Sequence, residues 1–394
     1  MIVHASTDRS HLKPAVTGLG YTAMAIAPTE PEGSLAASAI VAAVADAGVE
    51  LADVDGLLLA TSQVPSANRV GLDIAGAVGL GDLSFLRQTE VKGASAGALL
   101  IEAVDAVASG QARVCVAVFA DAPIVRGSSA GSMFTKIGDG RGQRGIERAA
   151  GLLGAVPAYA LAASRLIHNG EFRREDLASV AIAARSWAVH NPQAVARTPL
   201  TLDAYNNSPM IAEPLRRLDC ARPVNGAAAF VVTKPHSGQQ NPPVTLRGVG
   251  EWHPRRSHKP STEALYSTAP FPVAAATYGR AGIRPADLDI VQLYDPFTVA
   301  TLHLLAGYGI AGDDDLVELV RAGELEHRGR LAVNTGGGQL SGWYLQGMTP
   351  LVEALIQLRG EGGARQVPGA ELGLVAMVGG RFDHHMALVL ERGA

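Results

Sequence analysis

Tyr294 is the residue that most directly suggests chemistry. It follows a predicted buried strand and precedes an acid and a proline in VQLYDPF, residues 291–297. The apolar VQL is typical of a buried strand and FTVATLHLLAGYG of the helix after it, so the phenol lies at a strand's carboxyl end, where α/β folds usually place reactive groups. A phenol has a reference pKa of about 10, and a neighbouring dipole or hydrogen bond can lower it, so proton transfer is a reasonable role. A packed tyrosine with its hydroxyl satisfied is the alternative.

A glycine-rich stretch, VNTGGGQLSGWYLQGM at 333–348, is the second candidate. Three successive glycines let the backbone approach a ligand closely and leave N–H groups that can face an anion. The stretch lacks GKS or GKT, so it is not a phosphate-binding P-loop, and no convincing GxGxxG follows a strand elsewhere. A nucleoside triphosphate site is therefore not predicted.

Cysteine and histidine do not indicate a metal or a disulfide framework. Cys115 lies in the apolar run VCVAVF and Cys220 in LDCARP, which fits a reducing cytoplasm. His384 and His385 are adjacent on a predicted strand, and adjacent strand residues point to opposite faces. We expect surface or core histidines there, and no metal site.

Length and composition exclude several classes of protein. The 394 residues are 47% hydrophobic with a formal net charge of -4, enough for a sizeable core and unsuited to a nucleic-acid partner. The N-terminus has no apolar signal core, and no run approaches the roughly 18 apolar residues of a membrane span. The expected protein is soluble and cytoplasmic, without membrane insertion.

The elements that would position these residues follow an α/β pattern with an internal repeat. Helices alternate with short apolar strands. DAGVELADVDGLLLA at 46–60 resembles GRAGIRPADLDIVQLY at 279–294, with AG, AD and D at a constant offset of 234. GALLIEAVDAVASGQARVCVAV at 97–118 is loosely repeated by GMTPLVEALIQLRG followed by LGLVAMVGG. Although AD and AG pairs can recur by chance, we predict two halves of similar plan.

Two irregular segments interrupt the pattern. GSSAGSMFTKIGDGRGQRGIER at 127–148 is glycine-rich and basic, and EWHPRRSHKPSTEALYS at 251–267 is similar in character. Both are typical of solvated loops. Alternatively, their Arg and Lys side chains meet the phosphates of a nucleotide-bearing substrate.

Four motifs in one order resemble the thiolase superfamily, and within it the sterol-carrier or lipid-transfer type thiolases. They are LDCARPVNGAAAFVV, PADLDIVQLYDPF, GRLAVNTGGGQLSG and a terminal strand containing GG. The resemblance implies an α/β thiolase fold, with two similar βαβ-type halves in a five-layer αβαβα arrangement. We place the N-terminal half at 16–245, with a loop excursion at about 121–215, and the C-terminal half at 246–394. It also implies a CoA thioester substrate and a homodimer, which we expect to pair near VCVAVF.

The thiolase nucleophile is missing from the matching stretch, VKGASAGALLIEAV. Gly93 occupies the position of the family's catalytic cysteine, and Met377 that of its late cysteine. Ser95 is two residues further on, but nothing beside it in sequence resembles an activating base. Glycine cannot accept an acyl group, so no covalent acyl-enzyme is expected.

Both catalytic histidines are replaced by tyrosine. Tyr294 stands where the first histidine precedes DPF, and Tyr344, ten residues after Asn334, stands where the second is expected. For either tyrosine alone, packing is the simpler interpretation. Their joint placement at both histidine positions favours catalysis.

This combination resembles the steroid side-chain-cleaving aldolases of the superfamily. Such enzymes cleave a β-hydroxyacyl-CoA by a retro-aldol reaction, releasing a ketone or aldehyde and a shorter acyl-CoA. One tyrosine, as phenolate or through a water, would take the hydroxyl proton and the other would hold or protonate the enolate. We favour Tyr344 at the enolate, although the reverse assignment stays open. Substrate-binding and oxyanion groups are expected at Gly93, Asn334, Gly337 and Gly338, and Asn334 could equally shape its turn.

The resemblance also bears on cofactors and partners. No cofactor is expected apart from the CoA of the substrate itself. This chain resembles aldolases that act together with a small OB-fold, zinc-ribbon protein. The resemblance therefore implies a hetero-oligomer with such a partner. Two alternatives stay open: a non-catalytic acyl-CoA or lipid carrier, and a structural subunit on a thiolase scaffold.

Overall fold

A computed structural model describes residues 13–60, 71–127, 142–237, 239–253, 271–312 and 314–393. Much of the two irregular segments, 127–148 and 251–267, lies outside these residues. Predictions about their basic side chains therefore stay predictions.

The described strands form one long sheet in the order β3-β2-β4-β7-β1-β8-β11-β10-β9. The N-terminal half contributes β1 (Ala15–Tyr21), β2 (Gly56–Ala60), β3 (Phe85–Thr89), β4 (Val114–Asp121) and β7 (Gly226–Thr233). The C-terminal half contributes β8 (Val244–Trp252), β9 (Ile290–Leu293), β10 (Leu372–Gly379) and β11 (His384–Arg392). The half-sheets join where the start of β1 pairs with the start of β8. The predicted half boundary at 245/246 falls within the first residues of β8.

The two halves repeat one plan of strands. In the N-terminal half β2 is parallel to β4, β4 antiparallel to β7, and β7 antiparallel to β1. In the C-terminal half β9 is parallel to β10, β10 antiparallel to β11, and β11 antiparallel to β8. The strands β2 and β9 occupy equivalent places, and they carry the ends of the similar sequences at 46–60 and 279–294. The predicted α/β fold of two similar halves is confirmed.

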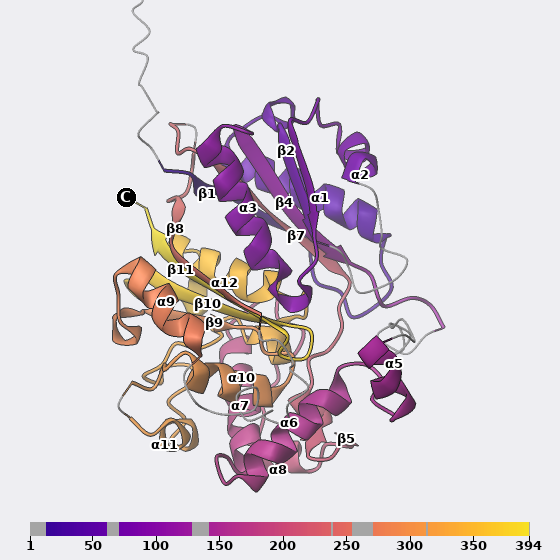
Figure 1. Cartoon of the computed structure of the whole chain (residues 1–394), viewed down its shortest axis with the longest axis vertical. Helices are drawn as coiled ribbons and strands as arrows, with labels where there is room; N and C mark the ends of the chain where they lie inside the picture. Colours follow the sequence, from indigo (N-terminus) through magenta and orange to yellow (C-terminus); the bar gives the residue numbers. More distant parts are fainter. Residues whose placement is uncertain are drawn as a thin grey trace, which may run out of the picture.

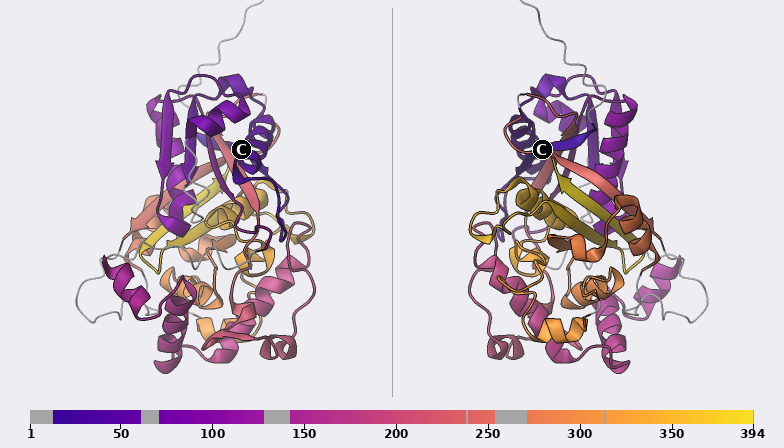
Figure 2. Two further views of the ribbon diagram at one scale, coloured as in Figure 1. Left: turned by 90° about the vertical axis from the view of Figure 1, so that its right-hand side faces the viewer. Right: turned by 90° about the vertical axis from the view of Figure 1, so that its left-hand side faces the viewer.

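Helices lie between the half-sheets and on their outer faces (Figures 1 and 2). α3 (Ser95–Ser109) and α12 (Met348–Arg359) contact each other and the strands of their own halves. Every residue of α12 is buried, as expected for a helix covered on all sides. α1 (Glu32–Ala47) packs on β1, β7 and β4, and α9 (Pro272–Ala281) packs on β8 and β11. The layers therefore alternate helix, sheet, helix, sheet and helix.

The excursion between β4 and β7 is a helical lobe beside the C-terminal half (Figure 1). It contains α5 (Gly142–Ala149), α6 (Val156–His168), α7 (Arg174–Ala188), α8 (Leu202–Asn206), β5 (Met210–Ala212) and β6 (Leu215–Arg216). Asp176 of α7 pairs with Arg321 of α11 (Leu316–Arg321) at 2.7 Å. Trp187 Nε1 donates to the carbonyl oxygen of Leu325 at 2.8 Å. The lobe therefore covers residues of the other half of the chain.

The structure corrects the expected dimer edge. The run VCVAVF lies in β4, which pairs with β2 on one side and β7 on the other. A strand whose backbone groups are already paired cannot add a strand from a second chain. Among the described strands, β3 and β9 end the sheet. No helix in the described ranges is long and apolar enough to cross a bilayer.

Candidate active site

Tyr294 and Tyr344 meet at the junction of the two halves. The N–H of Tyr294 continues the pairing of β9 by donating to Ala376 O on β10 at 2.9 Å. Tyr344 follows the single-turn segment Gly338–Gly342 (η7), and its backbone bridges to Pro223 just before β7. The two phenol oxygens are 3.3 Å apart. Residues separated by fifty positions in the chain therefore form a hydrogen-bonded pair, with either oxygen able to donate.

Gly93 lies directly against the ring of Tyr294. It belongs to the one-turn helix η3 (Lys92–Ala94) that leads into α3. A Cβ at this position would be 2.4 Å from Tyr294 Cζ and 2.4 Å from Val378 O, distances that real Cβ atoms do not reach. The ring therefore fills the space where a nucleophilic side chain would stand. Gly93 therefore presents only its backbone to the site.

Met377 and Gly347 complete this packing. Met377 is fully buried on β10, and a Cβ on Gly347 would be 3.0 Å from its sulfur and 2.4 Å from Gly93 O. Two glycines thus allow η3 and the segment after Tyr344 to approach backbone to backbone. The positions that the sequence comparison placed together, 93, 294, 344 and 377, are neighbours in the fold.

Both phenols are protonated at neutral pH. Burial raises the pKa of Tyr344 to about 12, the hydrogen bond with Tyr294 opposes that rise, and the charge of Asp121 adds to it. Burial raises the pKa of Tyr294 well above its usual value, and the neighbouring Tyr344 and Tyr159 raise it further. The expectation that the surroundings lower a phenol pKa is therefore not met, because removal from water outweighs the local hydrogen bond.

Asn334, Gly337 and Gly338 shape the loop beside this pair. Asn334 has a left-handed φ of 51° and its Oδ1 accepts a hydrogen bond from Leu293 N–H at 2.6 Å. The N–H of Gly337 donates to Asn334 O at 2.8 Å, so it is used within the loop. A Cβ on Gly338 would lie 2.1 Å from Asp295 Oδ2. These residues fix the backbone, and their roles as oxyanion or substrate groups stay predictions.

Three residues at the site were not identified from the sequence. Asp295 is fully buried and follows Tyr294 directly, and burial raises the pKa of its carboxyl to about 8 against opposing hydrogen bonds, first from Gln339 N–H. Asp121 ends β4, and Tyr159 belongs to α6 of the helical lobe. The sequence did contain one signal for Asp121. It is a polar residue at the end of the apolar run VCVAVFAD, much as Tyr294 follows the apolar run VQL. Nothing local identifies Tyr159.

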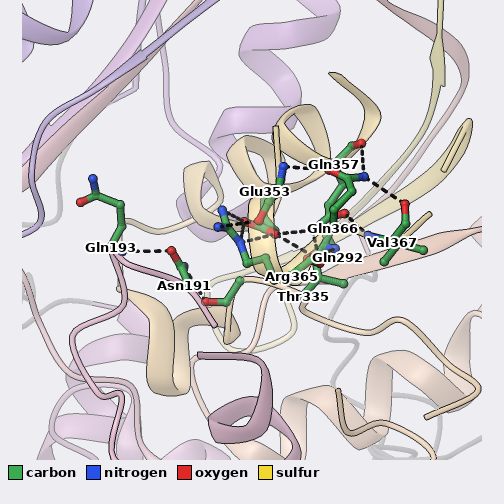
Figure 3. A network of polar contacts seen from close by, with 11 residues as sticks. Asn191, Gln193, Gln292, Thr335, Glu353, Gln357, Arg365, Gln366 and Val367 are labelled. Carbon is green, nitrogen blue, oxygen red and sulfur yellow. Dashed lines mark hydrogen bonds and ion pairs between the residues drawn. The ribbon is translucent and has the colours of Figure 1, made fainter. Parts of the chain in front are cut away.

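A buried polar network supports the far side of the glycine loop (Figure 3). Glu353 of α12 pairs with Arg365 at 3.0 Å and accepts a hydrogen bond from Thr335 Oγ1 at 2.8 Å. Asn191 Nδ2 donates to Gly336 O at 2.8 Å. Gln292 Nε2 donates to Thr335 Oγ1 at 2.9 Å. The loop is therefore held by Asn191, which follows α7, by Glu353 of α12 and by Gln292 of β9.

The two adjacent histidines point to different surroundings, as predicted. His385 is buried among aromatic rings, 4.6 Å from that of Phe271 and 4.9 Å from that of Trp252 between centroids. His384 Nδ1 lies 3.1 Å from His253 Nδ1 at the end of β8. In the parts of the chain that the structure describes, no group of three or more His, Cys, Asp or Glu residues is arranged to hold a metal.

Comparison with known proteins gives a consistent set of similarities. The family model described as thiolase C-terminal domain-like matches residues 250–392. The 17-hydroxy-3-oxo-4-pregnene-20-carboxyl-CoA lyase of Mycobacterium tuberculosis is 32% identical over 359 residues, covering 88% of this chain and 91% of the relative. The steroid side-chain-cleaving aldolase of Thermomonospora curvata is 31% identical over 368 residues, covering 88% and 90%.

A solved structure agrees over nearly the whole chain. The structure titled Ltp2-ChsH2(DUF35) aldolase superposes with a TM-score of 0.83 at 29% sequence identity, covering 96% of this chain and 98% of that one. The likeness therefore extends through both halves of the chain.

Proposed function

The chain belongs to the thiolase superfamily, in its branch of steroid side-chain-cleaving aldolases, and from this premise we propose that it cleaves a bulky β-hydroxyacyl-CoA by a retro-aldol reaction. It is an aldolase, a carbon–carbon lyase, that acts on acyl-CoA thioesters. The products are a ketone or aldehyde and a shorter acyl-CoA. The observation that carries the proposal is the tyrosine pair, 3.3 Å apart, packed on a glycine that excludes a nucleophile.

The reaction needs one proton to move from oxygen to carbon. As the β-hydroxyl loses its proton, its electrons form the carbonyl, the Cα–Cβ bond breaks, and that electron pair becomes the thioester enolate. One phenol oxygen takes the hydroxyl proton, and the other phenol delivers a proton to Cα. The proton taken up by the first phenol passes to the second through the hydrogen bond between them. Both phenols are then neutral again, as they were before the reaction. No standing phenolate is required, which suits two phenols whose pKa values are raised.

Tyr344 is the better candidate for the acid at the enolate. The hydrogen bond between the two phenols lowers the pKa of Tyr344 and raises that of Tyr294, which favours Tyr344 as the proton donor. A stronger acid transfers its proton more readily to a forming carbanion. Tyr294 would then receive the hydroxyl proton. Backbone donors near Gly93 and the glycine loop would lower the energy of the enolate oxygen.

The proposal extends to partners and setting. The solved relative is named as a pair of components, Ltp2 and ChsH2(DUF35), which supports a second protein here as well. We further propose a homodimer through the edge strand β3. The chemistry drawn above uses protein side chains and the CoA ester alone, so no further cofactor is proposed. Two cysteines in the whole chain suit a reducing cytoplasm.

A product assay tests the proposed function. The purified protein, with and without a co-purified second component, is incubated with a panel of steroid and other bulky β-hydroxyacyl-CoA thioesters. Mass spectrometry should find a carbonyl product and an acyl-CoA shortened at the Cα–Cβ bond, in equal amounts. The intact protein mass should stay unchanged. Tight binding of the thioesters without cleavage would instead favour the acyl-CoA carrier, and an acylated protein would contradict the mechanism.

A further inference from the structure

The residues before and after Tyr294 are both hydrogen-bonded to the glycine-rich stretch at 333–348. The residue before it, Leu293, donates its N–H to Asn334 Oδ1 at 2.6 Å. The residue after it, Asp295, accepts a hydrogen bond from Gln339 N–H on Oδ1 at 2.8 Å. The backbone around the first tyrosine is therefore tied to the glycine loop at two points.

The same loop leads to Tyr344 by a short, hydrogen-bonded path. Ser341 and Gly342 both donate to Gly337 O at 3.0 Å, and Trp343 N–H donates to Gly338 O at 3.2 Å. Trp343 O accepts a hydrogen bond from Thr349 Oγ1 at 3.0 Å. A shift of the loop relative to β9 would be carried along this path to the second tyrosine.

The two polar side chains are held there against their ordinary preferences. Asp295 is fully buried and Asn334 is 4% exposed, and burying polar groups costs free energy unless they are bonded. Asn334 also adopts a left-handed φ of 51°, which asparagine tolerates better than most residues other than glycine. Gly338 leaves no room for a Cβ beside the carboxyl group. Asn334 Oδ1 and Asp295 Oδ1 each accept a hydrogen bond that joins β9 and the residue after it to the loop.

We propose that Asp295 and Asn334 form a clasp that fixes the distance between the two phenols, and that both are positioning residues for cleavage. This inference rests on the proposed function. Proton transfer between the phenols depends on their spacing, and a displacement of about 1 Å at a reacting group can cost about a hundredfold in rate. The clasp acts through its acceptor atoms. A carboxyl group with a pKa near 8 is largely protonated at neutral pH, so its charge is not needed.

Three variants and a control test the clasp by the split between kcat and KM. Asp295→Ala removes the acceptor for Gln339, and Asn334→Gly removes the acceptor for Leu293 while suiting the left-handed backbone. Each should lower kcat about a hundredfold with KM changed less than about threefold. Asp295→Asn keeps an acceptor oxygen and should recover kcat to within about tenfold of the wild type.

Thr335→Val is the matched control. Thr335 belongs to the same loop and is also buried, but its hydroxyl bonds the side chains of Glu353 and Gln292 and makes no bond to Leu293 or Asp295 (Figure 3). This variant should lower the melting temperature as much as the clasp variants do, because it also leaves buried polar groups unpaired. Its kcat should stay within about threefold of the wild type.

The outcomes separate the clasp from a general loss of structure. Folded Asp295→Ala and Asn334→Gly proteins with wild-type kcat would overturn the clasp and leave the proposed function standing. An equal loss of kcat in Thr335→Val would also overturn it, since any weakening of the loop would then suffice. If Asp295→Ala does not fold, Asn334→Gly against Thr335→Val decides the question. A wild-type protein that cleaves none of the thioesters would remove both the function and the clasp.

Discussion

At the scale of single residues, the site is defined by a shared space between Gly93 and Tyr294. Either a side chain at position 93 or the phenol ring fits there, since a Cβ would lie 2.4 Å from the ring. The glycine at position 93 and the tyrosine at position 294 therefore depend on each other sterically. A side chain introduced at position 93 would displace the ring.

Gly93→Ala should show this directly. The added methyl forces Tyr294 or β10 to move, so we expect a loss of about 1–3 kcal/mol in unfolding free energy and about a hundredfold in kcat. Chemical denaturation and the cleavage assay measure the two effects. Gly76→Ala on α2 (Gly71–Val78) is the control, because a Cβ there meets nothing within 4 Å. The control should be neutral or slightly stabilising, and a Gly93→Ala enzyme as active as this control would refute the shared space.

His385 should make stability depend on pH. Burial, together with the nearby His303, lowers the pKa of its imidazole from 6.5 to about 3. Because the folded state resists protonation, the unfolded chain binds more protons below about pH 6.5, and stability falls as the pH falls. Relative to His385→Phe, the wild type should lose about 2 kcal/mol between about pH 7.5 and about pH 5. Urea unfolding of both proteins at each pH measures the difference, and equal slopes would show that His385 titrates normally.

The residues proposed to carry the chemistry could be predicted from the sequence where each lies in a short motif. Tyr294, Tyr344 and Gly93 were each placed by a short stretch of sequence, and the fold brings them together. Tyr159 reaches the site from α6, and Asp121 from the end of β4, through contacts between distant parts of the chain. The direction of the phenol pKa shifts also could not be predicted from the sequence, because it depends on burial by those distant elements.

At the scale of elements, the repeated letters of the two halves have a physical explanation. Gly48 and Gly282, in the matching AG pairs, both end a helix with a left-handed φ of 67°. The last letter shared by the two similar sequences is Asp55 in one half and Asp289 in the other. Asp55 accepts hydrogen bonds from the N–H groups of Arg113 and Val114 at the start of β4, and Asp289 accepts them from those of Glu371 and Leu372 at the start of β10. These are short-range rules of capping and strand alignment, so the sequence could reveal the repeat. The helical lobe has no counterpart in the other half, which left it as an undefined excursion.

The lobe is attached to the β10–β11 turn through Arg381. Its guanidinium pairs with Glu147 of α5 and donates to Gly154 O at 2.9 Å. Arg381→Met should free the start of the lobe without unfolding the core, because these bonds are buried and charged. We expect amide exchange in α5 and α6 to speed up about tenfold or more, with exchange in β4 and α12 unchanged. Arg330→Met, which breaks a half-exposed pair with Asp314, is the control and should leave exchange in the lobe as it is.

At the scale of the whole molecule, the proposed homodimer would pair through β3, which ends the sheet among the described strands. β3 pairs with β2 on one side, and Arg87 and Gln88 on it are exposed. If two β3 strands meet across a twofold axis, Gln88→Cys should form a disulfide between chains under mild oxidation. Selectivity is expected because Cys115 is buried and Cys220 is half-buried. Arg284→Cys, at an exposed site in the other half, should give monomers on a non-reducing gel. A concentration-independent monomer by light scattering would contradict the dimer.

We propose that a pair of neutral tyrosines, and no nucleophile, breaks the carbon–carbon bond. The most direct measurement is single-turnover cleavage of a β-hydroxyacyl-CoA by Tyr294→Phe and Tyr344→Phe, with the melting temperature of each variant recorded. Phenylalanine keeps the ring that packs on Gly93 and removes only the hydroxyl, so both variants should fold and bind the thioester. If the two phenols transfer the protons, each variant should lose about a hundredfold or more in rate. Stable variants that both cleave at nearly the wild-type rate would contradict it.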